Sequence, residues 1–268
     1  MSELIRSVEL KLNRAGSQVH LLTQSISTWV AHNPITADCK LRDGRLGFQL
    51  IQKDFAENPP LDEWSLLLGE CVHNLRSALD NLAFALARVR LDPPENPNRI
   101  AFPIYQDRGL FEKNGRGNID QLPDAAAALI ERLQPFQRNG TPKFGTPDRD
   151  ALVLLQSLSN ADKHRVPSVV LLAPTDLSHN ASTVFYSDED ASANVPPDAT
   201  IWAGPLQPGV VLMELRTNKP LASVSGKFEG HAIVAIQSPI ESVAVAPTLM
   251  ALHQYTALVI SQFGSFFQ

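Results

Sequence analysis

Residues 62–90 read DEWSLLLGECVHNLRSALDNLAFALARVR, an uninterrupted amphipathic pattern that decides the fold. Its apolar residues recur in alternating steps of three and four, at Trp64, Leu68, Cys71, Leu75, Ala78, Leu82, Ala85 and Val89. That spacing places them on one stripe of an α-helix. Asp62 and Glu63 suit the first turn, because carboxylates interact favourably with the helix dipole there. The stretch therefore predicts a long helix, from Asp62 to about Arg90, that faces a partner.

A similar pattern precedes it and predicts that partner. The same steps join Ile5, Val8, Leu12, Ala15, Val19, Leu22, Ile26 and Trp29. The pattern stops near Asn33-Pro34, because a proline restricts the residue before it. Two stripes of similar length predict an antiparallel pair in a helix bundle. Further helices are expected near residues 123–133, over about residues 148–165 and at residues 246–268.

The remaining sequence predicts strands. Two runs of alternating apolar residues flank Asp43-Gly44, whose tolerance of positive φ favours a tight turn, and they predict a β-hairpin from about Ile35 to Lys53. Beyond Pro167, β-branched runs alternate with Pro, Gly and Asn, which is typical of antiparallel strands. These runs are Val169 to Leu172, Thr183 to Tyr186, Ile201 to Ala203, Val210 to Leu215, Ala232 to Ile236 and Ser242 to Val245. We therefore predict an α+β fold, a long-helix bundle packed with a mostly antiparallel sheet.

We expect residues 1–268 to form a single domain, because the early hairpin needs later strands to cover it. The domain would comprise a helix-rich part (1–165) with the hairpin at 35–53, a β-rich part (166–245) and a C-terminal helix (246–268). The apolar end of that last helix, Phe263 to Phe267, is expected either in the core or in a homodimer interface.

The composition limits the kinds of partner that the protein is expected to bind. The net charge of -5 gives no global attraction to phosphate backbones, which argues against an extended nucleic-acid surface. Two cysteines, Cys39 and Cys71, predict no disulfide framework. No window reaches the roughly 18 apolar residues of a membrane span, and the first residues lack the apolar core of a secretory signal. We expect a cytoplasmic protein without a membrane partner.

Two polar clusters interrupt the apolar helices, HNLRSALDN at residues 73–81 and NADKHR at residues 160–165. Burying ionisable groups is costly unless they are paired, so each cluster indicates either an ion-pair network or a site. Helical geometry puts His73, Arg76 and Asp80 on a face that we expect to be partly covered. The face expected to be exposed to solvent carries Glu63, Glu70, Asn74, Ser77, Asn81 and Arg88.

In one interpretation the clusters hold helices together. Arg76 would pair with Asp162 and Asp80 with Arg165, with His73 hydrogen-bonded nearby. Asp162 falls in the last turn of its helix, where the dipole opposes an anion, so a cation such as Arg76 is expected beside it. An Arg and an Asp four residues apart, as at 76 and 80, also have the spacing to pair within one helix.

In the second interpretation the same residues form a site. Arg76, Lys163 and Arg165 would clamp a phosphate, and His73 or His164 would move a proton. A third interpretation is a metal site that combines His73, Asp80, Asp162 and His164. These residues lack a recognised ligand spacing, so no metal is predicted. No Rossmann, Walker or Cys-x-x-Cys motif is present, and no cofactor is predicted either.

Four stretches carry a resemblance as a set: GECVHNLRSALD (69–80), FPI (102–104), LQPF (133–136) and NADKHR (160–165). Together they resemble a family of uncharacterised bacterial proteins, over about residues 62–165, and this resemblance implies no established activity. More distantly, the polar, Arg-containing helix in a helical core resembles HEPN domains. These are helical modules found in RNA-cleaving toxins, defence systems and nucleotide-binding proteins.

HEPN ribonucleases use an Arg followed closely by a His. Here the matching positions after Arg76 hold Asn81, Leu82 and Ala83, so the resemblance implies a member that does not cleave. We therefore expect a binding module for a nucleotide or another anionic ligand. Its expected ligand-binding residues are Arg76, Asp80, Asp162, Lys163 and Arg165, with His73 beside them. The alternatives are a phosphodiester-cleaving enzyme with His73 or His164 as acid/base, and a structural or partner-binding protein.

Overall fold

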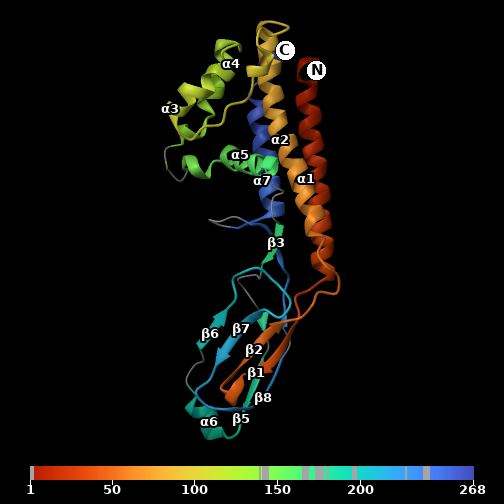
Figure 1. The fold of residues 1–268 in the computed structure, drawn as a ribbon, viewed down its shortest axis with the longest axis vertical. Helices are drawn as coiled ribbons and strands as arrows, with labels where there is room; N and C mark the ends of the chain where they lie inside the picture. Colours follow the sequence, from red (N-terminus) through yellow and green to blue (C-terminus); the bar gives the residue numbers. More distant parts are fainter. Residues whose placement is uncertain are drawn as a thin grey trace. The chain divides into compact units, whose positions relative to one another are not determined.

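The computed structural model describes residues 3–138, 140, 145–164, 169–172, 178–179, 181–194, 198–226, 228–237 and 242–268. It shows an α+β fold with mostly antiparallel strands, as predicted (Figure 1). The α-helices are α1 Arg6–His32, α2 Leu61–Arg90, α3 Arg108–Leu110, α4 Asp124–Arg132, α5 Ala151–His164, α6 Asp188–Ala193 and α7 Val245–Ser261. The strands are β1 Ala37–Leu41, β2 Gly47–Gln52, β3 Val169–Leu172, β4 Ser178–His179, β5 Ser182–Phe185, β6 Asp198–Ile201, β7 Val211–Arg216, β8 Leu221–Ser225, β9 Phe228–Glu229, β10 Ile233–Ile236 and β11 Val243–Ala244. None of the described helices has the length and apolar composition that a membrane span needs.

The chain divides into two compact units. A helical unit comprises Met1–Thr23, Asp62–Ser168 and Val245–Gln268, and a β-rich unit comprises Gln24–Leu61 and Val169–Ala244. The predicted helix-rich part (1–165) is thereby divided, because residues 24–61, which include the end of α1 and the hairpin, belong to the β-rich unit. That residues 1–268 unfold as a single cooperative domain stays a prediction.

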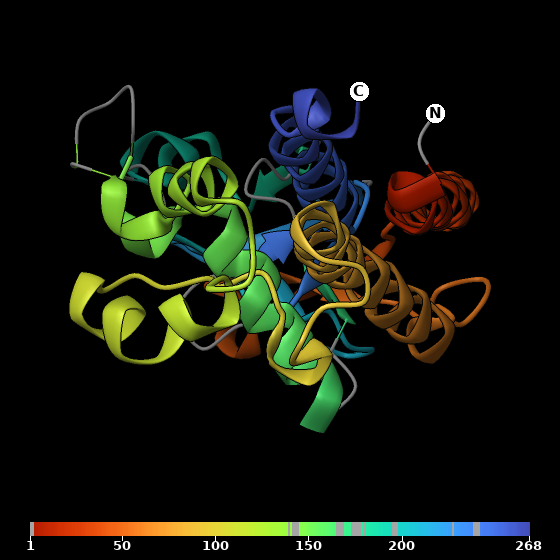
Figure 2. The same ribbon diagram turned by 90° about the horizontal axis from the view of Figure 1, so that it is seen from above.

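In the helical unit α1 and α2 lie side by side and antiparallel, as the two stripes predicted (Figure 2). The stripe of α2 is buried from Trp64 to Ala85, with Leu68, Cys71, Leu75 and Leu82 fully inaccessible to solvent, whereas Val89 at its end is exposed. These side chains exclude water from a continuous apolar core, and each contributes about 1.5–3 kcal/mol through burial. The apolar residues spaced three and four positions apart thus predicted both helices correctly.

A polar seam joins α1 to α2 on the face of α2 that we expected to be exposed. Lys11 Nζ donates to Asn74 Oδ1 at 3.1 Å, Asn74 Nδ2 donates to Gln18 Oε1 at 2.9 Å, and Gln18 Nε2 donates to Glu70 Oε2 at 2.6 Å. The prediction that Asn74 faces solvent is wrong, because Asn74 is buried. The reason is that α1 covers this face with polar side chains that satisfy the amide of Asn74.

The end helix α7 packs closely against α1. His253 Nε2 lies 3.2 Å from the carbonyl oxygen of Leu12. A β-carbon at Gly16 would come within 2.9 Å of the same nitrogen, so the missing side chain at residue 16 makes room for the imidazole. Phe263, in the apolar end of the C-terminal segment, is fully buried. The expected homodimer stays a prediction.

The start of α5 differs from the predicted start near residue 148. The helix begins at Ala151, after a 3-10 turn at Pro147–Arg149. Asp150 accepts a hydrogen bond from Leu152 N at 2.8 Å through its Oδ1 atom, so its side chain caps the helix. The boundary was misplaced because Asp150 is a capping residue rather than part of the apolar repeat.

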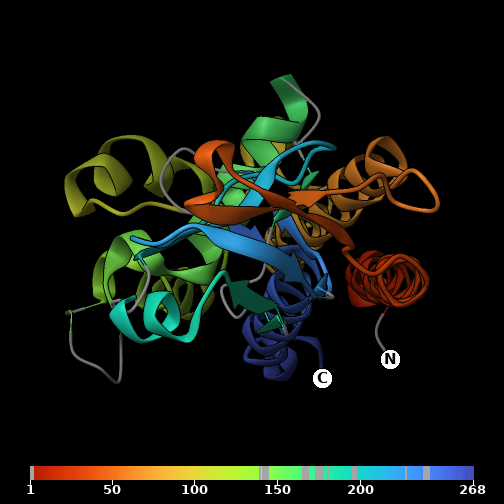
Figure 3. The same cartoon turned by 90° about the horizontal axis from the view of Figure 1, so that it is seen from below.

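The β-rich unit confirms the hairpin and its later partner strands. Strands β1 and β2 pair antiparallel around Gly44, whose φ is 72°, and Cys39 lies opposite Leu50. Strand β2 then pairs with β7, which places Phe48 opposite Leu215 in a sheet of order β1-β2-β7-β6 (Figure 3). Smaller antiparallel groups are β11-β10-β3, β4-β9 and β5-β8. We did not predict β8, because its sequence LASVS contains a single β-branched residue.

Candidate functional site

Arg76 and Asp80 of α2 bind each other and the backbone of Phe102. Arg76 Nη2 lies 2.8 Å from Asp80 Oδ1 and donates to Phe102 O at 2.6 Å, while Phe102 N donates to Asp80 Oδ1 at 3.0 Å. Arg76 Nη1 is also buried and has no hydrogen-bond partner among the described residues. Within the described chain no ion pair joins Arg76 to Asp162, so that predicted pair is wrong. Arg76 instead uses a carboxylate one turn along its own helix.

A buried glutamine holds the segment that follows Phe102. Gln134 is fully inaccessible to solvent; its Nε2 atom donates to Pro103 O at 2.8 Å, and its Oε1 atom accepts from Tyr105 N at 3.1 Å. Phe136 N donates to Tyr105 O at 3.3 Å. The structure thus brings together three of the four stretches that carry the resemblance, those at 69–80, 102–104 and 133–136.

The fourth stretch meets α2 through Asp162. A β-carbon placed on Gly69 would overlap Oδ1 of Asp162, so the glycine allows the carboxylate of α5 to approach the backbone of α2. The side chains of Lys163 and His164, and all of Arg165, lie outside the described residues. The predicted Asp80–Arg165 pair and the phosphate clamp therefore stay predictions.

This close approach predicts an unusual effect of substituting Gly69. Replacing an exposed glycine in the middle of a helix by alanine generally stabilises a protein by about 0.5–1 kcal/mol. Here we expect it to lower the free energy of unfolding by about 1 kcal/mol, because the carboxylate of Asp162 has to turn away to make room for the new methyl group. Urea unfolding followed by circular dichroism measures the change. The double variant with Asp162→Ala should recover most of the loss, and a Gly69→Ala protein as stable as wild type would contradict the contact.

His73 lies on the exposed side of α2, where its Nε2 atom is 3.4 Å from Ser77 Oγ. Among the described residues it makes no hydrogen bond to Arg76 or Asp80. Within the same part of the chain, no three His, Cys, Asp or Glu side chains gather as metal ligands. The structure therefore separates His73 from the Arg76 network that the sequence placed on the same face.

A groove lies beside this network, between residues 104–110 and α5, and its volume is about 470 Å³. We call it the amide groove; it is lined by Ile104, Tyr105, Gln106, Asp107, Leu110, Val153, Gln156, Ser157 and Asn160. Ligand sites commonly occupy roughly 300–1,000 Å³, so the groove is large enough for a small molecule. Sequence reasoning assigned no role to these residues, because loop 104–107 has no periodicity and the polar residues of α5 look like an ordinary surface.

Most polar groups of the amide groove are uncharged hydrogen-bonding groups. Gln156 Nε2 donates to Asn160 Oδ1 at 2.8 Å across one turn of α5. Whichever way the two amides are turned, this bond leaves one acceptor and one donor for a ligand. Among the described lining residues Asp107 alone is charged, and its Oδ1 atom accepts a hydrogen bond from Leu110 N at 2.8 Å. The groove thus favours a ligand part that is uncharged and has its own donors and acceptors.

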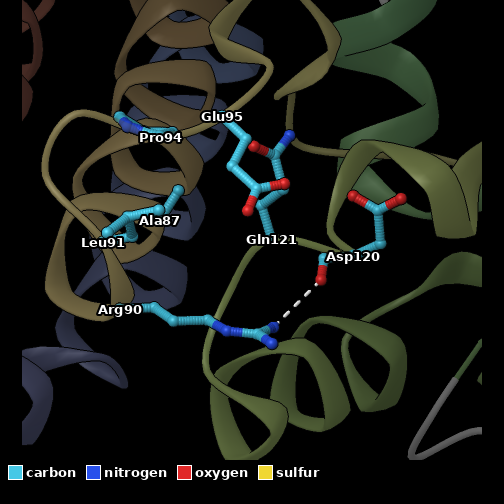
Figure 4. Close-up of a pocket in the computed structure, with 7 residues that line it drawn as sticks. All are labelled: Ala87, Arg90, Leu91, Pro94, Glu95, Asp120 and Gln121. Carbon is cyan, nitrogen blue, oxygen red and sulfur yellow. Dashed lines mark hydrogen bonds between the residues drawn. The ribbon is translucent and has the colours of Figure 1, made fainter.

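A smaller cavity of about 120 Å³ lies near the C-terminal end of α2 (Figure 4). Its polar groups serve internal contacts: Arg90 Nη1 donates to the carbonyl oxygens of Asp120 at 3.1 Å and Leu122 at 3.2 Å. Gln121 bonds both backbone groups of Asn96, at 2.8 and 3.1 Å. Because of its size and these internal bonds, we assign this cavity a structural role.

Comparison with known proteins gives no assignment, since no protein-family model, curated protein or solved structure matches this chain. The geometry of the amide groove and of the Arg76 network is therefore the basis for a function.

Proposed function

We propose that the protein is a cytoplasmic, non-cleaving binding module, HEPN-like in its helical unit, that holds a nucleotide in the amide groove. The observation that carries the proposal is a groove of about 470 Å³ in which two amide side chains, Gln156 and Asn160, stand one helical turn apart. The edges of nucleobases carry adjacent donors and acceptors, and side-chain amides pair with such edges. Ile104, Leu110 and Val153 supply apolar contacts for the faces of a base.

The phosphate of the nucleotide is assigned to the basic end of α5. Among the described residues that line the groove there is no cation, whereas Lys163, His164 and Arg165 follow Asn160 closely along the chain. Lysine and arginine bind phosphate through charge-assisted hydrogen bonds. The assignment of Lys163 and Arg165 as ligand residues comes from the sequence alone.

The surroundings of Arg76 and His73 support binding without cleavage. The guanidinium of Arg76 is engaged by Asp80 and by the carbonyl oxygen of Phe102, while His73 lies exposed beside Ser77. An acid/base residue has to come within hydrogen-bond reach of the reacting group. An arginine and a histidine turned to different surroundings do not form the paired arrangement of a phosphodiester-cleaving site.

Isothermal titration of the purified protein with AMP, adenosine and ribose 5-phosphate tests the proposal. We expect AMP to bind more tightly than either fragment. Asn160→Ala should weaken AMP binding about two- to tenfold, the effect of one hydrogen bond worth roughly 0.5–1.5 kcal/mol. Lys163→Ala should weaken AMP but not adenosine. Asn13→Ala, which removes an exposed amide from α1, is the matched control and should change neither affinity.

Two results would overturn the proposal. If none of AMP, GMP, CMP and UMP binds at millimolar concentration, the clusters serve a structural or partner-binding protein instead. If the protein cleaves RNA and His73→Ala abolishes cleavage, the protein is an enzyme. Both assays use the same preparation of residues 1–268.

A further inference from the structure

Side chains supply most of the hydrogen bonds to the loop wall of the amide groove, beside two backbone bonds, from Ala101 N to Asn118 O at 3.4 Å and from Phe136 N to Tyr105 O at 3.3 Å. Residues 101–105 belong to no helix or strand, so their backbone groups lack the regular partners of secondary structure. Asp80 and Arg76 bind the N–H and C=O groups of Phe102, and Gln134 binds Pro103 O and Tyr105 N. Ile104 and Tyr105, which line the groove, lie in or next to this fixed segment.

Both walls of the groove contact helix α2. Arg76 and Asp80 attach the loop wall to α2, through a short charge-assisted bond of 2.6 Å to Phe102 O. The other wall, α5, meets α2 at Gly69, where the carboxylate of Asp162 takes the space of a side chain. One stretch of α2, residues 69–80, thus contacts both sides of the groove.

We propose that Arg76 and Asp80 are positioning residues for the amide groove, which set its ligand affinity through the backbone of residues 102–105 without touching the ligand. This inference rests on the proposed function of the groove. It explains why Arg76, whose side chain is only 13% exposed, is paired with Asp80, whose side chain is 36% exposed. The charges of the pair are used to hold a loop rather than to bind phosphate.

Comparing AMP with adenosine, which lacks the phosphate, distinguishes positioning of the groove wall from direct contact with the ligand. If Arg76 positions the wall, Arg76→Ala should weaken adenosine and AMP by the same factor, about tenfold, since a charged hydrogen bond that holds the wall is lost. If Arg76 binds the phosphate, only AMP should weaken, and this result would overturn the inference. The matched control is Arg88→Ala, because Arg88 of α2 pairs with an aspartate four residues later, Asp92, at 2.8 Å and away from the groove. It should leave both affinities unchanged.

Conservative replacement of Asp80 supplies a second readout. Asp80→Asn keeps an acceptor for Phe102 N, so it should retain more of the affinity than Asp80→Ala, and both comparisons are made at a temperature where every variant is folded. Hydrogen–deuterium exchange of the Phe102 and Tyr105 amides needs no ligand. We expect exchange at Phe102 to rise about tenfold in Asp80→Ala, and unchanged exchange would overturn the inference. If no nucleotide binds the wild type, the proposed function fails, while the exchange measurement still decides whether the pair holds the wall.

Discussion

Replacing Asp150 by alanine is expected to lower the free energy of unfolding of the helical unit by about 3–5 kcal/mol. Asp150 is buried, its Oδ2 atom lies 2.5 Å from Arg138 Nε, and its Oδ1 atom caps α5 at Leu152 N. Alanine would leave a partly buried guanidinium without its carboxylate and the first turn of α5 without its cap, and both losses act against the folded state.

Arg138 also links α7 to Asp150. Arg138 Nη2 donates to the hydroxyl oxygen of Tyr255, whose pKa is raised, first by burial and then by the charge of Asp150. Tyr255→Phe removes one hydrogen bond and should cost about 1 kcal/mol, much less than Asp150→Ala. Three separate stretches of the helical unit therefore meet at one charged pair.

Urea unfolding followed by circular dichroism at pH 7 measures these changes. Arg149→Ala is the matched control, because Arg149 is the exposed neighbour of Asp150 and forms no ion pair among the described residues. It should change the free energy of unfolding by less than about 0.5 kcal/mol. If Asp150→Ala is no more destabilising than Arg149→Ala, the Arg138–Asp150 pair does not contribute to the free energy of unfolding as expected.

Alkaline pH is expected to destabilise the protein through Cys71, by up to about 4 kcal/mol. Burial raises the pKa of this thiol from its ordinary value of 9.0 to about 12. Above pH 9 the unfolded chain gives up the proton while the folded protein keeps it, so the unfolded state binds fewer protons and stability falls with rising pH. At about 1.4 kcal/mol for each pH unit, the loss begins near pH 9 and is complete near pH 12.

A thiol-free variant isolates this effect from other alkaline titrations. Urea midpoints of wild type and Cys71→Ala should be compared at pH 7.5 and pH 10.5. Wild type should lose about 2 kcal/mol more than Cys71→Ala over this interval. Cys39→Ala is the control, since Cys39 is only partly buried and burial raises its pKa less. Equal losses in wild type and Cys71→Ala would show that Cys71 titrates alike in both states.

The sequence predicted the long elements well because each one carries its own signal. The stripes of α1 and α2 repeat over many turns, and the hairpin is marked by Asp43-Gly44, so neither needs information from elsewhere in the chain. Strand β8, by contrast, owes its state to pairing with β5, where Ser182 lies opposite Ser225, and a pattern of small residues does not reveal it.

The side-chain network was harder to predict than the helices that carry it. The spacing of Arg76 and Asp80 permits a pair within α2, but an acceptor on another helix satisfies the same charges equally well. The choice is made by Phe102, whose backbone reaches the pair from a loop without periodicity. The face of Asn74 was misjudged for a related reason, since a polar residue indicates solvent unless the covering helix is also polar.

The three chain segments of the helical unit have a consequence for how the protein is made. His253 contacts the carbonyl of Leu12 across 241 positions of sequence, and Tyr255 reaches Arg138 across 117. During synthesis, Leu12 of α1 and Arg138 therefore cannot form these contacts until α7 has been synthesised. Contacts between such distant residues also slow the search for the native state. Until α7 is present, the Leu12 carbonyl and the Arg138 guanidinium therefore lack these two hydrogen-bond partners.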